Sequence, residues 1–384
     1  MQLISRQRVD VAIIGGGITG CAAAWYLANE GVSVALLEAG ELNAQASGSN
    51  AGSLHAQIPQ DTFLELGDGW AQSFAPTLKL LRGSIALWRQ ADEALDGALE
   101  VRINGGLMLA STPEEMQHIE RKARFEQAAG TETRILSATD LRAMAPYLSP
   151  HLVGAGFCTA EGKANPLVAA TTFARSAQAA GAQIHRNQAV LAIGPQRGRY
   201  RLNTPDLEVD ASRVIIAAGA GTPSITKLLG SAKLDIQSVP IQMSVTEPVA
   251  PLMSQLLYYA RAPLTMKQTD AGTILIGGGW PARLDAQRRP VPDPHSLGQN
   301  LGLALEVVPA LANITLMRTW AATVNGTDDW KPIIGELPGS PGVYLGYVPW
   351  MGFTGGPAAA RIVASMVQDR EPSLGFDVGP FAPR

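Results

Sequence analysis

The sequence predicts an α/β fold built around a parallel sheet. The prediction rests on three stretches, residues 9–38, 213–221 and 342–367. Each runs from an apolar strand into a turn of glycine and other small residues, and the first and the third continue into a helix. Fully apolar strands that alternate with helices are typical of parallel sheets covered on both faces.

The first stretch is expected to bind a dinucleotide. Its strand, Val9–Ile14, and its helix, Cys21–Glu30, are joined by the pattern G-x-G-x-x-G. The first glycine allows a tight turn, the second lets a pyrophosphate approach the backbone, and the third lets the helix pack against the sheet. Free N–H groups at the helix N-terminus can then bind the phosphates. The residues assigned to this contact are Gly15, Gly16, Gly17, Ile18 and Gly20.

An acidic residue ends the second strand of this stretch. The strand is Ser33–Leu37, and Glu38 follows it at the spacing at which a carboxylate accepts hydrogen bonds from ribose hydroxyls. A carboxylate in this place disfavours the 2′-phosphate of NADP but leaves NAD and FAD open. We therefore count Glu38 and Ala39 among the dinucleotide-binding residues.

Later parts of the chain return to the dinucleotide. Residues 44–57, "AQASGSNAGSLHAQ", contain no large side chain before Leu54, so their backbone can lie against a flat ligand. The alternative interpretation is a flexible surface loop. Near the C-terminus, the glycines of "GFTGG" are followed by Pro357, which suits the first turn of a helix. A helix that starts there would aim a second positive dipole end at the ligand.

Charge and cysteine content exclude several classes of protein. The chain has 384 residues and a net charge of −3, which argues against a non-specific nucleic-acid binder. Its two cysteines, Cys21 and Cys158, form no C-x-x-C motif, so we expect neither a disulfide framework nor a metal site. The N-terminus lacks an apolar signal region, and no unbroken apolar run reaches about 20 residues. We expect a cytoplasmic protein without a transmembrane segment.

Taken together, these stretches resemble the FAD-dependent oxidoreductases of the D-amino-acid oxidase, glycine oxidase and sarcosine oxidase family. The resemblance covers nearly the whole chain and rests on "IIGGGITG", "ASGSNAG", "GKANPLVAATTFARSAQAAGA", "VIIAAGAGTP", "PIIGE" and "GFTGGPAAARIVASM". "ASGSNAGSLHAQ" and "GFTGGP" look most like the FAD subunits of opine oxidases and hydroxyproline dehydrogenases. The resemblance implies that the dinucleotide is FAD. Neither cysteine lies near the C-terminal glycines, so we expect non-covalent binding.

The resemblance also assigns further residues to FAD. The small-residue loop would contact the pyrophosphate and the isoalloxazine, and Val190 the adenine. The C-terminal turn would lie at the pyrimidine edge, where the Thr354 hydroxyl and the next two amides would stabilise negative charge on the reduced ring. These residues are Ala46, Ser47, Asn50, Ala51, Gly52, Ser53, Val190, Gly219, Gly352, Phe353, Thr354, Gly355 and Gly356.

The family pattern implies two interleaved domains, a Rossmann-type FAD-binding domain and an α+β substrate domain with an antiparallel sheet and helices on one side. The FAD domain would comprise residues 1–82, 146–230 and 318–384, and the substrate domain residues 83–145 and 231–317. The residues themselves predict helices at 113–130 and 166–180, strands within "RINGGLMLAST" and "TILIGGG", a strand at 189–193 and an exposed loop in "ARLDAQRRPVPDP".

The chemistry implied by the resemblance is oxidation of a C–N bond by hydride transfer to flavin N5, giving an imine. The substrate would be a small amine or amino acid of the proline, hydroxyproline, opine, glycine or sarcosine type. The finer resemblance implies partner subunits that accept the electrons. Two alternatives stay open: an FAD subunit that only relays electrons or scaffolds a complex, and a flavin dehydrogenase acting on a C–O bond.

The usual carboxylate anchors of the relatives are missing. The relatives carry an arginine four residues after a tryptophan, but Val324 stands four residues after Trp320; their second arginine corresponds to Trp350. Either another residue binds the carboxylate or the substrate has no simple α-carboxylate there. The candidates for the anchor are Arg261, which is our first choice, Lys331, Lys267, Tyr258 and Tyr259. His55 is a further candidate for the substrate side of the flavin.

Overall fold

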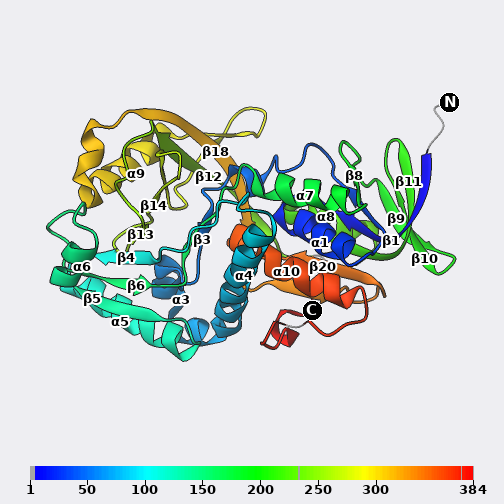
Figure 1. Cartoon of the computed structure of the whole chain (residues 1–384), viewed down its shortest axis with the longest axis horizontal. Coiled ribbons are helices and arrows are strands. Elements are labelled where there is room, and N and C mark those ends of the chain that lie inside the picture. The colour runs from blue at the N-terminus through cyan, green and yellow to red at the C-terminus, as the bar shows by residue number, and fades with distance from the viewer. Residues whose placement is uncertain (1–4, 232–233, 373, 384) are drawn as a thin grey trace.

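The computed structural model describes residues 5–231, 234–372 and 374–383. Outside the described residues lie 1–4, 232–233, 373 and 384. They fall within the N-terminal segment and the domain segments predicted above. The two large sheets lie toward opposite ends of the long axis, with helix α4 (Ala75–Ala94) and the start of α10 (Gly352–Met366) between them (Figure 1).

The first sheet confirms the predicted α/β class. Its strands run in the order β19-β20-β11-β1-β2-β8, and all neighbours are parallel except β19 and β20. A hairpin of β9 and β10 continues antiparallel from β11. The bounds are β1 (Ser5–Ile14), β2 (Val34–Leu37), β8 (Gln183–His185), β9 (Ala192–Gln196), β10 (Arg199–Asn203), β11 (Leu207–Ile216), β19 (Ile333–Glu336) and β20 (Val343–Tyr347).

The second half of strand β1, residues 11–14, is buried on both faces, as expected for a central parallel strand. Its alternate residues belong to two different core clusters, Val11 and Ile13 on the helical side and Ala12 and Ile14 on the other. Ile14 pairs with Leu37 and with Ile216, so three strands end at one edge. That edge is where ligands of open α/β sheets bind.

The helices beside this sheet are α1 (Ile18–Asn29), α7 (Ala169–Ala179), α8 (Thr222–Leu228) and α10. Helix α1 packs against both α7 and α10, and its small residues Cys21–Ala24 are fully buried, which allows the close approach. The predicted strand at 189–193 is wrong by three residues: β9 begins at Ala192, where the chain is in register with β10.

The second sheet has the order β18-β12-β15-β14-β13-β4-β6-β5. It is antiparallel as expected except between β13 and β4, which are parallel. Three helices accompany it: α5 (Pro113–Ala128), α6 (Ala138–Met144) and α9 (Pro294–Val307). The strands are β4 (Gly106–Ala110), β5 (Thr133–Ser137), β6 (Gly154–Cys158), β12 (Gln237–Thr246), β13 (Leu256–Tyr259), β14 (Thr265–Gln268), β15 (Ile274–Gly277) and β18 (Leu316–Gly326).

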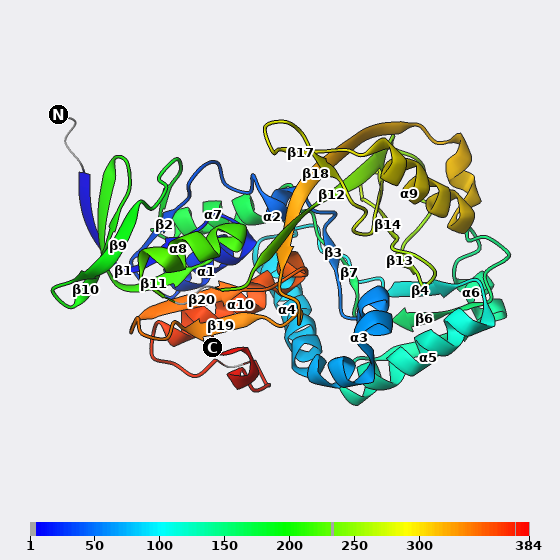
Figure 2. The same cartoon turned by 180° about the vertical axis from the view of Figure 1, so that it is seen from behind.

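The second sheet also receives strands from segments assigned to the FAD domain. β6 and most of β18 lie within residues 146–230 and 318–384, yet both pair in this sheet. The long pair β12–β18 reaches from the second sheet to the middle of the molecule (Figure 2). The domain boundaries themselves stay a prediction.

The shorter elements lie mostly at the seam between the sheets. They are α2 (Ala46–Ser49), α3 (Gln60–Ser73), β3 (Ser53–Leu54), which pairs with β7 (Gly162–Lys163), and the hairpin β16 (Arg283–Leu284)–β17 (Pro290–Val291) inside the predicted exposed loop. Short 3-10 turns cover Gly219–Gly221, Pro309–Asn313 and Gly379–Phe381. Among the described residues no helix has both the length and the apolar character needed to span a bilayer.

Helix α10 begins at Gly352, earlier than the predicted start near Pro357. Pro357 therefore lies inside the helix, where a proline removes one N–H and crowds the carbonyl four residues before it. Ser84 of α4 bridges the resulting gap: its hydroxyl donates to the Thr354 carbonyl (2.6 Å) and accepts from the Ala358 N–H (3.1 Å). The Trp88 indole N–H also donates to the Thr354 carbonyl (3.1 Å).

Candidate active site

The glycines after β1 form a cradle at the carboxyl edge of the first sheet. Gly15 has a φ of +112°, which favours glycine. A Cβ on Gly20 would lie 1.9 Å from the Gly15 carbonyl oxygen, so only glycine lets α1 start so close to β1. The Glu38 carboxylate accepts hydrogen bonds from the N–H groups of Gly16 (2.7 Å) and Gly40 (2.8 Å).

Two helix N-termini converge on this cradle. A Cβ on Gly356, the fifth residue of α10, would lie 2.7 Å from Cγ2 of Ile18, the first residue of α1, so α10 contacts the start of α1 within its second turn. Neither helix has a side-chain cap at its N-cap residue. Ser47 reaches the start of α1, where its Oγ accepts from the Ile18 N–H (3.0 Å). Two dipole ends beside a glycine turn fit a dinucleotide pyrophosphate and the ring that follows it.

The small-residue loop is ordered by its own side chains. Asn50 donates to the carbonyls of Ala46 and Ser47 and accepts from the Gly52 N–H (2.6 Å), so it closes α2. Gly52 has a φ of +77°, and a Cβ there would lie 2.1 Å from the Ala164 carbonyl. Asn50 and Gly52, which the resemblance assigns to the isoalloxazine, therefore also shape the loop itself. The alternative of a flexible surface loop is wrong here, since Ser53 and Leu54 are buried.

The Thr354 hydroxyl was predicted to donate to the reduced flavin, but it has other partners in the structure. The Oγ1 donates to the Ser53 carbonyl (3.1 Å) and accepts from the His55 N–H (3.0 Å), and the residue is fully buried. Its proton is thus used to join α10 to β3 and is not free for a ligand. Donation from α10 to a bound group is left to backbone amides of its first turn.

The remaining residues assigned to FAD are spread along the same edge. Ala39 is exposed just after β2, and Val190 packs partly buried against the core beside β11. Gly219 has a φ of +53° in the turn after β11. The Phe353 ring packs at a tilt against that of Trp88, with ring centroids 4.9 Å apart, and a Cβ on Gly355 would lie 2.8 Å from Val348. Their contacts with FAD stay a prediction.

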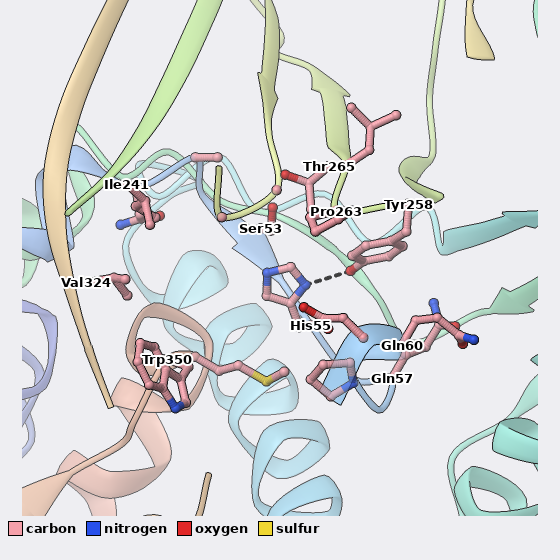
Figure 3. Close-up of a pocket in the computed structure, with 18 of the residues that line it drawn as sticks. Ser53, His55, Gln57, Gln60, Ile241, Tyr258, Pro263, Thr265, Val324 and Trp350 are labelled. Carbon is pink, nitrogen blue, oxygen red and sulfur yellow. Dashed lines mark hydrogen bonds between the residues drawn. The ribbon is translucent and has the colours of Figure 1, made fainter. Parts of the chain in front are cut away.

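A cavity of about 400 Å³ opens between this edge and the second sheet. One side is formed by residues 49–61 and 350–354, and the other by residues of β12, β13 and β18 and the turn before β14. Ile241, Val324 and Trp350 lie on one side of the view, and Tyr258, Gln57 and Gln60 on the other (Figure 3). The cavity brings together three of the predicted substrate residues, His55, Tyr258 and Tyr259, and has Arg261 in its wall.

His55 and Tyr258 form a hydrogen-bonded pair in this cavity. His55 Nδ1 lies 2.6 Å from the Tyr258 hydroxyl oxygen. Burial lowers the pKa of His55 to about 3, with Lys267 adding to the effect, so the imidazole is neutral at physiological pH. Burial also raises the pKa of the Tyr258 hydroxyl well above its usual value. The pair therefore offers neutral hydrogen-bonding groups to a ligand.

Two buried carboxylates hold the chain that carries His55. Glu161 accepts from the N–H groups of Ala56 (2.7 Å) and Gln57 (2.9 Å), and Glu126 accepts from the Ile58 N–H (2.9 Å). The Gln57 amide also donates to Glu161 (2.8 Å). Both carboxylates are fully buried, and burial raises the pKa of Glu161. The sequence analysis did not find these carboxylates; no motif in "TAEGKAN", which contains Glu161, indicates a buried role.

Lys122 supplies one positive charge to this network. Its Nζ donates to Glu126 (2.5 Å) and to the Gln57 side-chain oxygen (3.2 Å), and the residue is fully buried. The sequence did offer one sign of the ion pair: Lys122 and Glu126 stand four residues apart on α5, a spacing that brings two side chains together on a helix. From the hydrophobic pattern of α5 alone, both residues would be expected at the surface of the protein. That pattern does not show that residues 57 and 58 pack against them.

Lys267 is buried beside the cavity but is not part of its wall. Its Nζ donates to the Ser53 Oγ, and the residue is 3% exposed. Burial, with a contribution from Lys163, lowers its pKa from 10.5 to about 7. Ser53 thus lies between Lys267 and the cavity that Ser53 lines.

Arg261, the first choice for a carboxylate anchor, is already paired. Its Nη1 lies 2.7 Å from Glu306 Oε1, and the Tyr259 hydroxyl donates to the same oxygen (2.7 Å). The Arg261 side chain is 57% exposed. Arg261 lines the cavity, so its role as carboxylate anchor stays a prediction, although its guanidinium is mostly exposed and already pairs with Glu306. Lys331 is half-buried and does not line the cavity.

The two positions at which the family resemblance leads us to expect an arginine carry apolar side chains here. Val324 and Trp350 both line the cavity. The Trp350 indole N–H donates to the Thr327 carbonyl (2.9 Å), and its ring lies 5.5 Å from that of Trp330. Trp320 joins β18 to α2, because its indole N–H donates to the Ser49 carbonyl (2.8 Å).

Several known proteins are similar to this chain over most of its length. One subunit of the opine oxidase of Rhizobium meliloti is 27% identical over 354 residues, covering 88% of this chain and 87% of that protein. Glycine oxidase of Geobacillus kaustophilus is 27% identical over 385 residues, with 98% and 96% covered. The crystal structure of L-proline dehydrogenase from P. horikoshii superposes with a TM-score of 0.85 at 21% identity, covering 98% of each chain, and shares the fold.

The family comparison extends over most of the chain. The sequence model described as FAD dependent oxidoreductase matches residues 10–366, from within β1 to the end of α10. The match therefore includes the glycine cradle, both helix N-termini and the whole wall of the cavity. This chain belongs to the family of FAD-dependent oxidoreductases and is an FAD-dependent enzyme.

Proposed function

We propose that this enzyme oxidises the C–N bond of a secondary amine or amino acid to an imine, which water then converts to a carbonyl compound and an amine. The observation that carries the proposal is the cavity. Residues 50–53 and 350–354, most of them assigned to FAD, form one side of it, and the second sheet forms the other. The relatives named above are, by their names, oxidases or dehydrogenases of opines, glycine and proline, which supports an amine nitrogen in the substrate.

The proposed reaction balances as a two-electron oxidation. The C–H bond beside the nitrogen breaks, the hydrogen leaves with both electrons, and the nitrogen lone pair forms the C=N bond while the N–H proton passes to water. Bound FAD supplies the acceptor for the hydride. The lone pair must be free, so the amine has to react in its deprotonated form.

The neutral groups of the cavity suit that requirement. An imidazole with a pKa of about 3 carries no charge, so His55 can hydrogen-bond the amine without adding a positive charge beside it. Tyr258 fixes the imidazole through Nδ1, and Glu161 fixes the backbone next to it. We assign to His55 and Tyr258 the role of orienting the amine nitrogen, which brings its neighbouring carbon to the acceptor.

We also propose that the electrons leave through a partner protein rather than to oxygen. The Rhizobium meliloti relative is by its name one part of an opine oxidase assembly, and it is similar to nearly the whole of this chain. The test compares the isolated chain with an artificial dye and with oxygen. Slow peroxide formation beside fast dye reduction supports the proposal, and equal rates contradict it.

FAD is proposed to bind without a covalent bond. Cys21 and Cys158 are fully buried, and neither lines the cavity. Acid precipitation and centrifugation should leave the yellow colour in the supernatant. Colour that stays with the pellet would show a covalent link and overturn this part of the proposal.

The substrate type is tested with the holoenzyme under anaerobic conditions. Candidate amines, amino acids, hydroxy acids and glycerol phosphate are mixed with it, and flavin absorbance is followed. Rapid bleaching by amines alone supports C–N oxidation. Bleaching by hydroxy compounds alone would favour C–O oxidation, and bleaching by dithionite but by no organic compound would favour an electron-relay protein.

A further inference from the structure

The ribbon formed by β12 and β18 gives the cavity a continuous apolar stripe. Ile241 pairs with Ala322, and Met243 pairs with Trp320, and all four line the cavity. Alternate residues of a strand point to the same face, so these pairs and Val324 share one face of the ribbon. Met108 of β4 and Leu264 before β14 extend the apolar surface.

The charges in the wall do not suit a carboxylate. Among the described residues that line the cavity, the carboxyl and guanidinium side chains are Asp61, Glu161 and Arg261. Arg261 is 57% exposed and paired with Glu306. Glu161 belongs to a fully buried set in which one lysine, Lys122, stands against two carboxylates. A substrate carboxylate would therefore meet no buried cation among the described residues of this wall, since Arg261 is mostly exposed and shared with Glu306.

Lys267, the other nearby cation, is screened from the cavity. Its Nζ is turned to Ser53, and burial keeps the pKa of this ammonium near 7, so much of it is neutral at physiological pH. Burying a carboxylate without a charged partner is unfavourable by several kcal/mol. An uncharged polar or apolar group in the same place avoids that penalty and gains from contact with the stripe.

We infer that the substrate of this enzyme is an amine that carries an apolar group and no free carboxylate, an inference that rests on the amine oxidation proposed above. In the simplest case, R–CH₂–NH–R′ loses a hydride from carbon to FAD and a proton from nitrogen to water. Hydrolysis of the imine then yields R–CHO and R′–NH₂. The side chains that set the preference are Val324 and Trp350, which face the cavity without a charge.

The experiment uses pairs of compounds in which an amide replaces the carboxylate, with each rate corrected for the fraction of substrate whose amine is unprotonated. N-benzylglycine is compared with N-benzylglycinamide, and each enantiomer of proline with its prolinamide, by anaerobic bleaching of the flavin in the holoenzyme. The uncharged member of each pair should react at least tenfold faster at low concentration. Faster reaction of the acid in every pair would overturn the inference.

A binding measurement separates this inference from the proposed function. Benzoate and benzamide are redox-inert, and their affinities are read from the flavin difference spectrum and from thermal shift. Benzamide should bind at least tenfold more tightly than benzoate. If no amine bleaches a flavin that dithionite does reduce, the proposed function fails, while tighter binding of benzoate would contradict the charge preference on its own.

Two variants locate the preference. Val324→Arg places a cation on the apolar stripe and should shift the benzoate-to-benzamide affinity ratio at least tenfold toward benzoate, whereas the matched variant Val324→Leu should leave the ratio unchanged. Lys267→Met should not alter the ratio. Loss of benzoate binding in Lys267→Met would show that Lys267 receives carboxylates and would overturn the inference.

Discussion

Lys267 should make the stability of this enzyme depend on pH in a characteristic way. Burial lowers its pKa from 10.5 to about 7, so between these values the unfolded chain holds a proton that the folded chain has released. The free energy of unfolding then rises with pH across this window, by about 1.4 kcal/mol per pH unit and about 5 kcal/mol in total. The penalty is fully present below pH 7 and has disappeared above pH 10.5.

The perturbation is Lys267→Met, which keeps an unbranched side chain and removes the titrating group. Denaturant unfolding is measured with saturating FAD at pH values from about 7 to about 9.5, with the slope m compared at each pH. Wild type should gain stability relative to the variant by about 1.4 kcal/mol per pH unit. Ser53→Ala, which removes the hydrogen-bond partner but keeps the lysine, should retain the wild-type dependence. Parallel curves for wild type and Lys267→Met would refute the reasoning.

Three further substitutions test other parts of the structure. Gly20→Ala should abolish flavin binding, because the added methyl would lie 1.9 Å from the Gly15 carbonyl, whereas Gly302→Ala, in open space on α9, should leave flavin absorbance per protein unchanged. Ser84→Ala leaves the Ala358 N–H without its partner and should lower the free energy of unfolding by about 1–3 kcal/mol; an unchanged denaturation midpoint would contradict the bridge over Pro357. Arg261→Ala should change KM less than about fivefold, since exposed ion pairs contribute at most about 1 kcal/mol, and a steep rise in KM for a carboxylated substrate would restore Arg261 as the anchor.

The nucleotide-binding half could be predicted because its determinants are local. The glycine spacing after β1 and the acid after β2 each follow from backbone geometry within about 30 residues of chain, and the structure brings them together at one edge of the sheet, while their contacts with FAD stay a prediction. The same holds for α5, Pro113–Ala128, which begins at the predicted residue and ends two residues before the predicted end. The start of α10 was missed because Pro357 lies inside the helix, where Ser84, which is far away in the sequence, bridges Thr354 and Ala358.

The substrate half depended on contacts that the sequence does not display. Arg261 beside two tyrosines was our first choice for the anchor, and the sequence did not show that Glu306 on α9 pairs with both Arg261 and Tyr259. Glu161 and Glu126 hold residues 56–58, although they stand at least 68 positions away along the chain. Buried charges of this kind leave no periodic pattern, so tertiary packing alone assigns them to the site.

The most direct test of C–N oxidation is the product of a single turnover. Holoenzyme is mixed without oxygen with less than one equivalent of a secondary amine that bleaches the flavin, and the solution is analysed for carbonyl compound and released amine. The proposed function predicts one carbonyl and one amine for each flavin reduced, with slower bleaching when the carbon beside the nitrogen is deuterated. Bleached flavin without these products, or no bleaching by any amine of the panel, would contradict it.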